Sequence, residues 1–199
     1  MDEIINYILT GLILGITAGI SPGPLMAVLI SETVKGNIKN GITVSIIPVI
    51  TDIPLILLTI FILRKFENFH ILFNILYLIG GLTLIYFGIK DLFIKKISLN
   101  YELSKFSSLK KGIITNLLNP HPYIFWIFIG VPFIIEGNVY QMVAFIFSFF
   151  TGIVGSKILI ALTVEKSKSF IESEKYIYIV KISGIILIFF GLILFTKIG

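Results

Sequence analysis

The sequence predicts an all-α membrane protein with six transmembrane helices arranged as two inverted repeats of three. Three observations carry this prediction. First, 56% of the 199 residues are hydrophobic and 14% are charged, with a mean hydropathy of +1.02, a composition typical of integral membrane proteins. Second, the hydrophobic residues fall into six runs near the roughly 20 residues that a membrane-spanning helix needs. Third, a proline motif in the first run recurs in the fourth, 98 positions later.

The predicted spans are joined by mostly short loops. In chain order they cover residues 8–31, 41–63, 71–89, 112–135, 139–164 and 176–196. We expect a single membrane domain over residues 1–199, with a first repeat at 1–89, a cytoplasmic linker at 90–111 and a second repeat at 112–199. The N-terminus, Met1-Asp2-Glu3, is acidic where a signal peptide is basic, so the first span is expected to be retained.

The first span contains Ser21-Pro22-Gly23-Pro24 within a run of residues, 4–31, that carries no charge. Each proline removes a backbone donor and disfavours helical geometry in the residue before it, and glycine adds backbone freedom. In lipid, the freed carbonyl groups need partners, so such a break is tolerated only where protein or a water-filled cavity surrounds it. The motif therefore predicts a broken helix that faces a polar interior.

The second half of the chain repeats this pattern. Ile16-Thr17-x-x-Ile20-Ser21-Pro22-x-Pro24 corresponds to Ile114-Thr115-x-x-Leu118-Asn119-Pro120-x-Pro122, and the glycines at 81 and 88 correspond to those at 184 and 191. Because each half holds three spans, the second half must enter the membrane from the opposite side. The glycines are expected to permit close helix packing. Broken helices at matching places in two halves are the best sequence pointer to the binding site of a transporter.

Lysine and arginine are distributed unequally between the two sets of loops. Eleven lie in the loops after the first, third and fifth spans, whereas only Arg64, Lys65 and Lys197 lie on the other side. By the positive-inside rule the first set is cytoplasmic, so the N-terminus and the C-terminus both face outward. Topology and contact with anionic lipid account for the net charge of +5, and no nucleic-acid partner is predicted.

Only three formal charges, Asp52, Lys157 and Lys181, fall within the predicted spans. Asp52 lies near the middle of the second span, where a carboxylate costs about 2.5–3.5 kcal/mol on insertion scales, and such residues usually mark ion or substrate pathways. The alternative is a structural carboxylate that is paired or protonated. Lys157 is expected either to pair with Asp52 or to extend its ammonium group to the interface, as we expect for Lys181.

Polar side chains surround both breaks. Asn116 and Asn119 can replace the hydrogen bonds that proline removes, or they can ligate a cation or the polar head of a substrate. His121 is a candidate proton carrier, although a neutral, hydrogen-bonded histidine is more common. The half-helices beyond Pro24 and Pro122 would present positive dipole ends to a carboxylate. The predicted substrate- or ion-binding residues are Ser21, Pro22, Gly23, Pro24, Asp52, Asn116, Asn119, Pro120, His121 and Lys157.

The pattern of these residues resembles the LysE family of amino-acid exporters. The resemblance lies in Gly19-x-Ser21-Pro22-Gly23-Pro24, in Gly36 and Gly41 near the start of the second span, and in Gly112-x-x-x-Asn116-x-x-Asn119-Pro120-His121. It implies a six-helix fold that exports amino acids or related small metabolites, driven by a proton or sodium gradient, with Pro22, Gly23, Pro24, Asn119, Pro120 and Asp52 as functional positions. Pro122 and Pro48 depart from the family pattern.

Taken together, these features predict a secondary active exporter in the cell membrane, with a small-molecule substrate and a coupling proton or sodium ion. No catalytic residue, metal site or cofactor is predicted, because the sequence has no cysteine and no His-Glu-x-x-His motif. An intramembrane enzyme is disfavoured further because no second carboxylate lies within a predicted span. The alternative function is export of metal or other inorganic ions. Substrate, coupling ion and oligomeric state, a homodimer included, are left open by the sequence.

Overall fold

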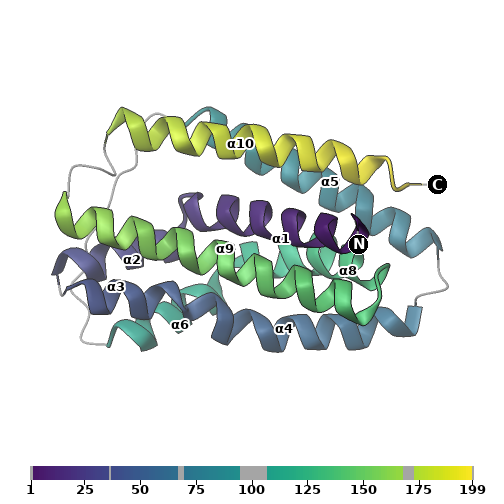
Figure 1. Ribbon diagram of the computed structural model, residues 1–199, viewed down its shortest axis with the longest axis horizontal. Helices are drawn as coiled ribbons and strands as arrows, with labels where there is room; N and C mark the ends of the chain where they lie inside the picture. The colour runs from purple at the N-terminus through teal and green to yellow at the C-terminus, as the bar shows by residue number, and fades with distance from the viewer. Residues whose placement is uncertain (1, 36, 67–69, 95–106, 168–172, 199) are drawn as a thin grey trace.

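The computed structural model is a bundle of helices that run along one shared direction (Figure 1). It describes residues 2–35, 37–66, 70–94, 107–167 and 173–198, and no strand occurs among them. The helices are α1 (Asp2–Ile20), α2 (Pro24–Lys35), α3 (Ile38–Ser45), α4 (Ile47–Leu63), α5 (His70–Leu92), α6 (Ser108–Leu118), α7 (Pro120–Phe125), α8 (Val131–Ile135), α9 (Val139–Lys166) and α10 (Glu174–Phe195), with a 3-10 turn at Arg64–Phe66 and a π-helical segment at Trp126–Gly130.

Five segments are long and apolar enough to cross a membrane. They are Glu3–Ile20, Ile38–Leu63, His70–Leu92, Val139–Lys166 and Glu174–Phe195. A sixth crossing results if Ser108–Leu118 and Pro120–Ile135, which are bent by 53° relative to each other, form one span. The predicted all-α, multi-pass membrane architecture is therefore confirmed.

The first helix is broken at the predicted motif, but it begins earlier than predicted. α1 starts at Asp2 rather than at residue 8 and ends at Ile20, and α2 resumes at Pro24 after three residues that are not helical. Proline suits this first helical position because its fixed φ is preorganised and its missing N–H would have no intrahelical partner. With 19 residues, α1 is about 28 Å long at 1.5 Å per residue, so it can cross most of a bilayer before the break.

The second and fourth spans are also interrupted beside prolines. α3 and α4 are separated at Ile46, two residues before Pro48, whereas Pro54 lies inside α4 without ending it. In the fourth span, α6 ends at Leu118 and α7 begins at Pro120, as predicted. The π-helical segment that follows was not predicted; it precedes Pro132, which cannot donate a hydrogen bond to the preceding turn.

Glycines bring α5 and α10, which lie side by side in Figure 1, into backbone contact. A Cβ atom on Gly88 would lie 2.5 Å from the carbonyl oxygen of Gly184, and one on Gly184 would lie 2.6 Å from that of Gly88. For Gly81 and Gly191 the corresponding distances are 2.9 and 2.8 Å. The paired glycines of the sequence therefore let these two helices approach closely, and the contacts are reciprocal.

A second close approach joins α1 to α9 and was not foreseen. Gly11, Gly15 and Gly19 follow one another at four-residue spacing on the face of α1 that meets α9. From the other side, a Cβ atom on Gly152 would lie 2.6 Å from the carbonyl oxygen of Leu12. This packing fixes the end of α1, and with it the first break, against the middle of α9.

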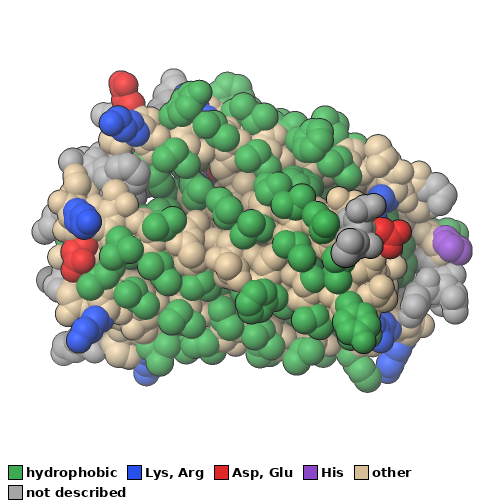
Figure 2. All heavy atoms as spheres, viewed as in Figure 1, with side chains coloured by type: hydrophobic (Ala, Val, Ile, Leu, Met, Phe, Trp, Pro, Cys, Tyr) green, Lys and Arg blue, Asp and Glu red, His purple; other side chains and the backbone are tan. Residues whose placement is uncertain are grey.

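The distribution of side chains on the surface is that expected of a protein that crosses a membrane. Hydrophobic side chains cover the middle of the face shown in Figure 2, and the charged side chains lie near the two ends of the bundle. Both termini lie toward the same end (Figure 1). Of the predicted linker, residues 90–94 and 107–111 belong mostly to the ends of α5 and α6, whereas Lys95, Lys96 and Lys105, like Gly36 and Lys168, lie outside the described residues.

Candidate functional site

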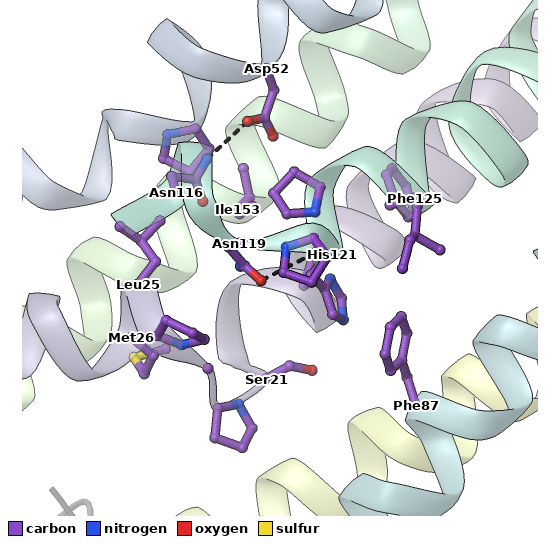
Figure 3. A pocket seen from close by; sticks show the side chains of 18 of the residues that line it. Ser21, Leu25, Met26, Asp52, Phe87, Asn116, Asn119, His121, Phe125 and Ile153 are labelled. Carbon is purple, nitrogen blue, oxygen red and sulfur yellow. Dashed lines mark hydrogen bonds between the residues drawn. The ribbon is translucent and has the colours of Figure 1, made fainter. Parts of the chain in front are cut away.

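A cavity of about 340 Å³ lies between the two helix breaks (Figure 3). Its wall includes all ten residues that the sequence predicts to bind substrate or ion, and they come from four regions of the chain. The structure thus brings together residues that are up to 136 positions apart, from Ser21 to Lys157. It also adds wall residues that the sequence did not indicate, among them Phe87, Lys90, Phe125, Trp126, Phe149 and Ile153.

Asp52 projects from α4 into this region and is only 4% exposed. It belongs to the buried stripe of the helix, which includes Pro48, Ile56 and Thr59 at helical spacing. Its Oδ1 atom accepts hydrogen bonds from Thr51 Oγ1 at 2.9 Å and from Asn116 Nδ2 at 3.0 Å.

The other carboxylate oxygen of Asp52 is bound by a residue that sequence reasoning missed. Its Oδ2 atom accepts a hydrogen bond from Trp126 Nε1 at 3.2 Å. Trp126 is fully buried at the start of the π-helical segment. Three uncharged donors therefore hold the carboxylate, and within the described part of the chain it forms no ion pair.

The two asparagines at the second break have different contacts. Asn116, in the last turn of α6, is 4% exposed, and its Nδ2 atom donates to Thr51 Oγ1 at 2.6 Å as well as to Asp52. Asn119 caps α7, because its Oδ1 atom accepts from the backbone N–H of His121 at 3.2 Å. The ring of His121 stacks on Phe87 with 4.0 Å between the ring centroids. Asn116 thus links α6 to α4, and Asn119 caps the half-helix that follows the second break.

Lys157 takes neither of the two positions expected from the sequence. It is 3% exposed, so its ammonium group does not extend to the interface, and no ion pair with Asp52 forms among the described residues. Instead, Nζ donates to the carbonyl oxygen of Gly19 at 3.4 Å. That oxygen lies at the end of α1, where helical carbonyls lack intrahelical partners and carry partial negative charge. The freed backbone of the first break therefore attracts the lysine.

Two further donors satisfy the carbonyl groups at the end of α1. Tyr176 Oη of α10 donates to the oxygen of Ile20 at 2.9 Å, and Ser183 Oγ donates to that of Thr17 at 3.4 Å. In a continuous helix, Ile20 would accept from residue 24, which is a proline and has no N–H. The expectation that protein groups surround the break and bind its free carbonyls is thus met for Gly19 and Ile20 by α9 and α10, whereas the carbonyl of Thr17 also accepts the backbone N–H of Ser21 at 2.9 Å.

A second buried carboxylate lies beside the first break, and the sequence analysis missed it. α5 continues to Leu92 rather than ending at residue 89, which places Asp91 inside a membrane-spanning helix with 7% exposure. Ser21 Oγ donates to Asp91 Oδ2 at 2.9 Å. The prediction that Asp52 is the only carboxylate within a span is therefore wrong. Asp91 follows Gly88 by three residues and therefore lies on the same face of α5. Extending the predicted third span by one turn along this face would have predicted that Asp91 points into the bundle.

Hydrophobic clusters close the cavity on two sides. Phe125, Trp126 and Phe149 contact one another with centroid separations of 4.9 to 5.1 Å, and they belong to a core that also includes Phe145 and residues of α8. Helix α8 lies toward the end of the bundle where the termini lie (Figure 1). A second core of α2, α3, α9 and α10 residues lies on the other side. Apolar clusters therefore pack on two sides of the cavity.

Comparison with known proteins gave one finding. The model of the LysE type translocator family matches residues 16–197, which is nearly the whole chain. No curated protein and no solved structure gave a match.

Proposed function

The chain belongs to the LysE type translocator family, and from this premise we propose that it exports amino acids or related small metabolites across the cell membrane, driven by a proton or sodium gradient. The observation that supports this most is a cavity at two broken helices that holds a buried acid and a buried base. Broken helices are where secondary transporters bind substrate and coupling ions. Because the family consists of translocators, no enzymatic activity is proposed.

The charges that line the cavity favour a zwitterionic substrate. Asp52 on α4 and Lys157 on α9 both line it, and they are not paired with each other. An α-amino acid carries an ammonium group and a carboxylate, so one molecule can interact with both residues. In this proposal Asp52 binds the ammonium group or the coupling cation, and Lys157 binds the carboxylate. Asn116 and Trp126 hold Asp52 in place.

The remaining wall favours a substrate with a neutral, apolar side chain. Phe87, Phe125 and Ile153 line the cavity together with Trp126. Among the described residues of the wall, Asp52 is the only acidic one, whereas Lys90 adds a second positive charge. A basic side chain would therefore lack a partner and would be repelled. Burying a charged group without an ion-pair or hydrogen-bond partner carries a high desolvation cost.

The helix contacts support the proposed inverted repeat. Two helices that are related by a two-fold axis touch through equivalent residues, so residue i contacts j and j contacts i. Gly81 and Gly88 correspond to Gly184 and Gly191 in the sequence, and the observed pairs are Gly81–Gly191 and Gly88–Gly184. This reciprocal pattern is what a pseudo-two-fold axis between α5 and α10 produces.

Contacts at the two ends of the bundle provide a basis for alternating access. Each end has a glutamate close to the end of the second half of a broken helix, and the contacts described for it include a hydroxyl and a lysine. Glu32 in α2 is bound by Ser108 and Lys111 at 2.6 and 3.1 Å, and Glu136 after α8 is bound by Tyr77 and Lys197. We propose that these two sets of contacts open in turn while the halves of the protein move around the cavity.

Export of metal or other inorganic ions is less well supported. In the described ranges, no group of three or more His, Cys, Asp or Glu side chains is placed to hold a metal ion. Transition metals in proteins are usually bound by several nitrogen, sulfur or carboxylate ligands. The wall of this cavity is instead largely apolar around a few polar groups, which is typical of sites for small organic molecules.

Transport into inverted membrane vesicles tests the proposal. Vesicles from cells that express the protein would receive a proton or sodium gradient, and uptake of radiolabelled L-leucine, L-phenylalanine and L-lysine would be measured. We expect gradient-driven uptake of a neutral amino acid, and we expect Asp52→Asn to abolish it while the amount of protein in the membrane is unchanged. Uptake equal to that of vesicles without the protein would overturn the amino-acid proposal. Full activity of the variant would remove Asp52 from the mechanism.

A further inference from the structure

Asp91 is a buried carboxylate that no part of the proposed substrate site uses. It lies one residue before the end of α5 with 7% exposure. It contacts the cavity indirectly, since Ser21 Oγ donates to its Oδ2 atom at 2.9 Å and Ser21 itself lines the cavity. Ionisable residues inside a membrane span are costly and commonly belong to proton or ion pathways. Asp91 lies one hydrogen bond away from the proposed substrate site, which makes it a candidate for a proton or ion pathway.

The two buried carboxylates have different surroundings. Asp52 accepts hydrogen bonds from Thr51, Asn116 and Trp126, and donors directed at a carboxylate stabilise its ionised form. For Asp91 the structure gives one such bond, from Ser21, and no ion pair within the described residues. A proton on Asp52 would disturb the two hydrogen bonds to Oδ1 or the one from the rigid indole N–H of Trp126 to Oδ2. A proton on Asp91 Oδ2 would disturb a single bond, to the Ser21 hydroxyl, which can reverse its direction.

The other titratable groups near Asp91 do not form an ion pair with it in the described part of the chain. Lys90 precedes it on α5, and Tyr176 of α10 lies close enough to interact with it electrostatically. Lys90 is exposed and forms no ion pair in the described part of the structure, and the hydroxyl of Tyr176 donates to the carbonyl of Ile20. On the α10 side the carboxylate is also adjacent to Gly184, where an added Cβ would lie 3.1 Å from the Cβ of Asp91.

We propose that Asp91 is the residue that binds the coupling proton, and that Ser21 transmits its protonation state to the cavity. This proposal rests on the proposed transport function, and it assigns Asp52 to substrate binding. When Asp91 is ionised, the single proton of the Ser21 hydroxyl points toward it, and the lone pairs of Ser21 face the cavity. When Asp91 takes a proton from water, its own O–H donates to Ser21 Oγ, and the Ser21 proton is free to turn toward the cavity.

Protonation of Asp91 therefore switches Ser21 between a hydrogen-bond acceptor and a donor for whatever occupies the cavity. No proton leaves Ser21 in this exchange; only the proton on Asp91 is gained or lost. A ligand that prefers one of the two states of Ser21 must change the proton affinity of Asp91 by the same factor, because binding linkage is reciprocal. Proton occupancy and substrate binding would thus be coupled without direct contact between Asp91 and the substrate.

Infrared difference spectroscopy of the full-length protein in liposomes tests this assignment without knowledge of the substrate. The protein would be titrated from about pH 4 to about pH 8, the range around ordinary and raised carboxyl titrations, while the C=O stretch of protonated, buried carboxyl groups is recorded. We expect a titrating band that is lost in Asp91→Asn, retained in Asp52→Asn and shifted in its titration midpoint in Ser21→Ala. Retention of the band in Asp91→Asn, or its loss in Asp52→Asn alone, would overturn the proposal.

A transport measurement separates this proposal from the failure of the proposed function. In liposomes, exchange of labelled for unlabelled L-leucine needs no net proton movement, whereas accumulation against a gradient does. We expect Asp91→Asn to retain exchange and to lose proton-driven accumulation, and Asp52→Asn to lose both. Equal loss of both by Asp91→Asn would indicate a structural role instead and would contradict the assignment. If the wild type moves no amino acid, the proposed substrate class fails, and the infrared titration still decides whether Asp91 binds the proton.

Discussion

Asn116→Ala is the substitution whose effect on the site can be worked out most fully. Asn116 is 4% exposed, and its amide group donates to Thr51 Oγ1 at 2.6 Å and to Asp52 Oδ1 at 3.0 Å. It connects the half-helix before the second break to the span that carries Asp52. Alanine removes both hydrogen bonds and leaves Asp52 with two of its three donors.

The expected loss in the free energy of unfolding follows from the two hydrogen bonds that Asn116→Ala removes. A hydrogen bond to a charged group contributes about 1.5–3 kcal/mol and one between neutral groups about 0.5–1.5 kcal/mol. Their sum predicts a loss of about 2–4.5 kcal/mol in the free energy of unfolding, before relaxation of the site. For a chain of this size, 1 kcal/mol corresponds to roughly 2–4 °C in Tm. Asn116→Ala should therefore lower Tm by about 4–18 °C.

Thermal unfolding of purified protein in detergent measures this loss. Trp126 is the only tryptophan in the sequence and is fully buried beside Asp52, so its fluorescence reports unfolding of the site itself. Asn6→Ala, at an exposed position of α1, is the matched control and should change stability by less than about 0.5 kcal/mol. If Asn116→Ala unfolded at the same temperature as this control, the polar contact between α4 and α6 would not stabilise the site.

Three further predictions concern packing, topology and access. Gly152→Ala should cost about 1–3 kcal/mol because its Cβ would meet the backbone of α1, whereas Gly155→Ala, with no described atom within 4 Å of its Cβ, should be neutral or stabilising; equal Tm values would refute the packing argument. Single cysteines at Glu136 and Ser107, in a chain without native cysteine, should react with an impermeant maleimide from opposite sides of the membrane; reaction from one side would overturn the topology. Glu136→Gln should accelerate labelling from outside of a cysteine at Ala18 in the cavity wall, and an unchanged rate would argue against the outer contacts.

The features that the sequence predicted well depend only on local patterns of residues. The breaks follow from Pro22, Pro24 and Pro120, because proline removes a donor wherever it stands. Asp52 is conspicuous because a carboxylate in the middle of an apolar run is costly. Both signals are readable without knowing which helices are neighbours. The ten predicted residues line one cavity, while their roles in binding stay predictions.

Most of the features that were missed depend on contacts between distant segments. Lys157 was expected to pair with Asp52 or to reach the interface, but a carbonyl oxygen freed by the first break is its partner. Trp126 reads as an ordinary apolar residue, and only the packing of α4 against the fourth span reveals its bond to Asp52. Asp91 was excluded because hydropathy ended the third span at residue 89, although the helix continues to Leu92. For Lys157 and Trp126 the partner belongs to another helix, which a linear pattern does not specify, whereas Asp91 was missed because the end of its helix was placed too early.

Intrinsic fluorescence of Trp126 provides the most direct test that this cavity is the substrate site. Purified protein would be titrated with the amino acid that the vesicles take up, and the emission of the single tryptophan would be followed. We predict a saturable change in intensity or wavelength that disappears in Asp52→Asn. An emission spectrum that stays constant while a transported amino acid saturates the protein would contradict the claim that substrate binds between the two broken helices.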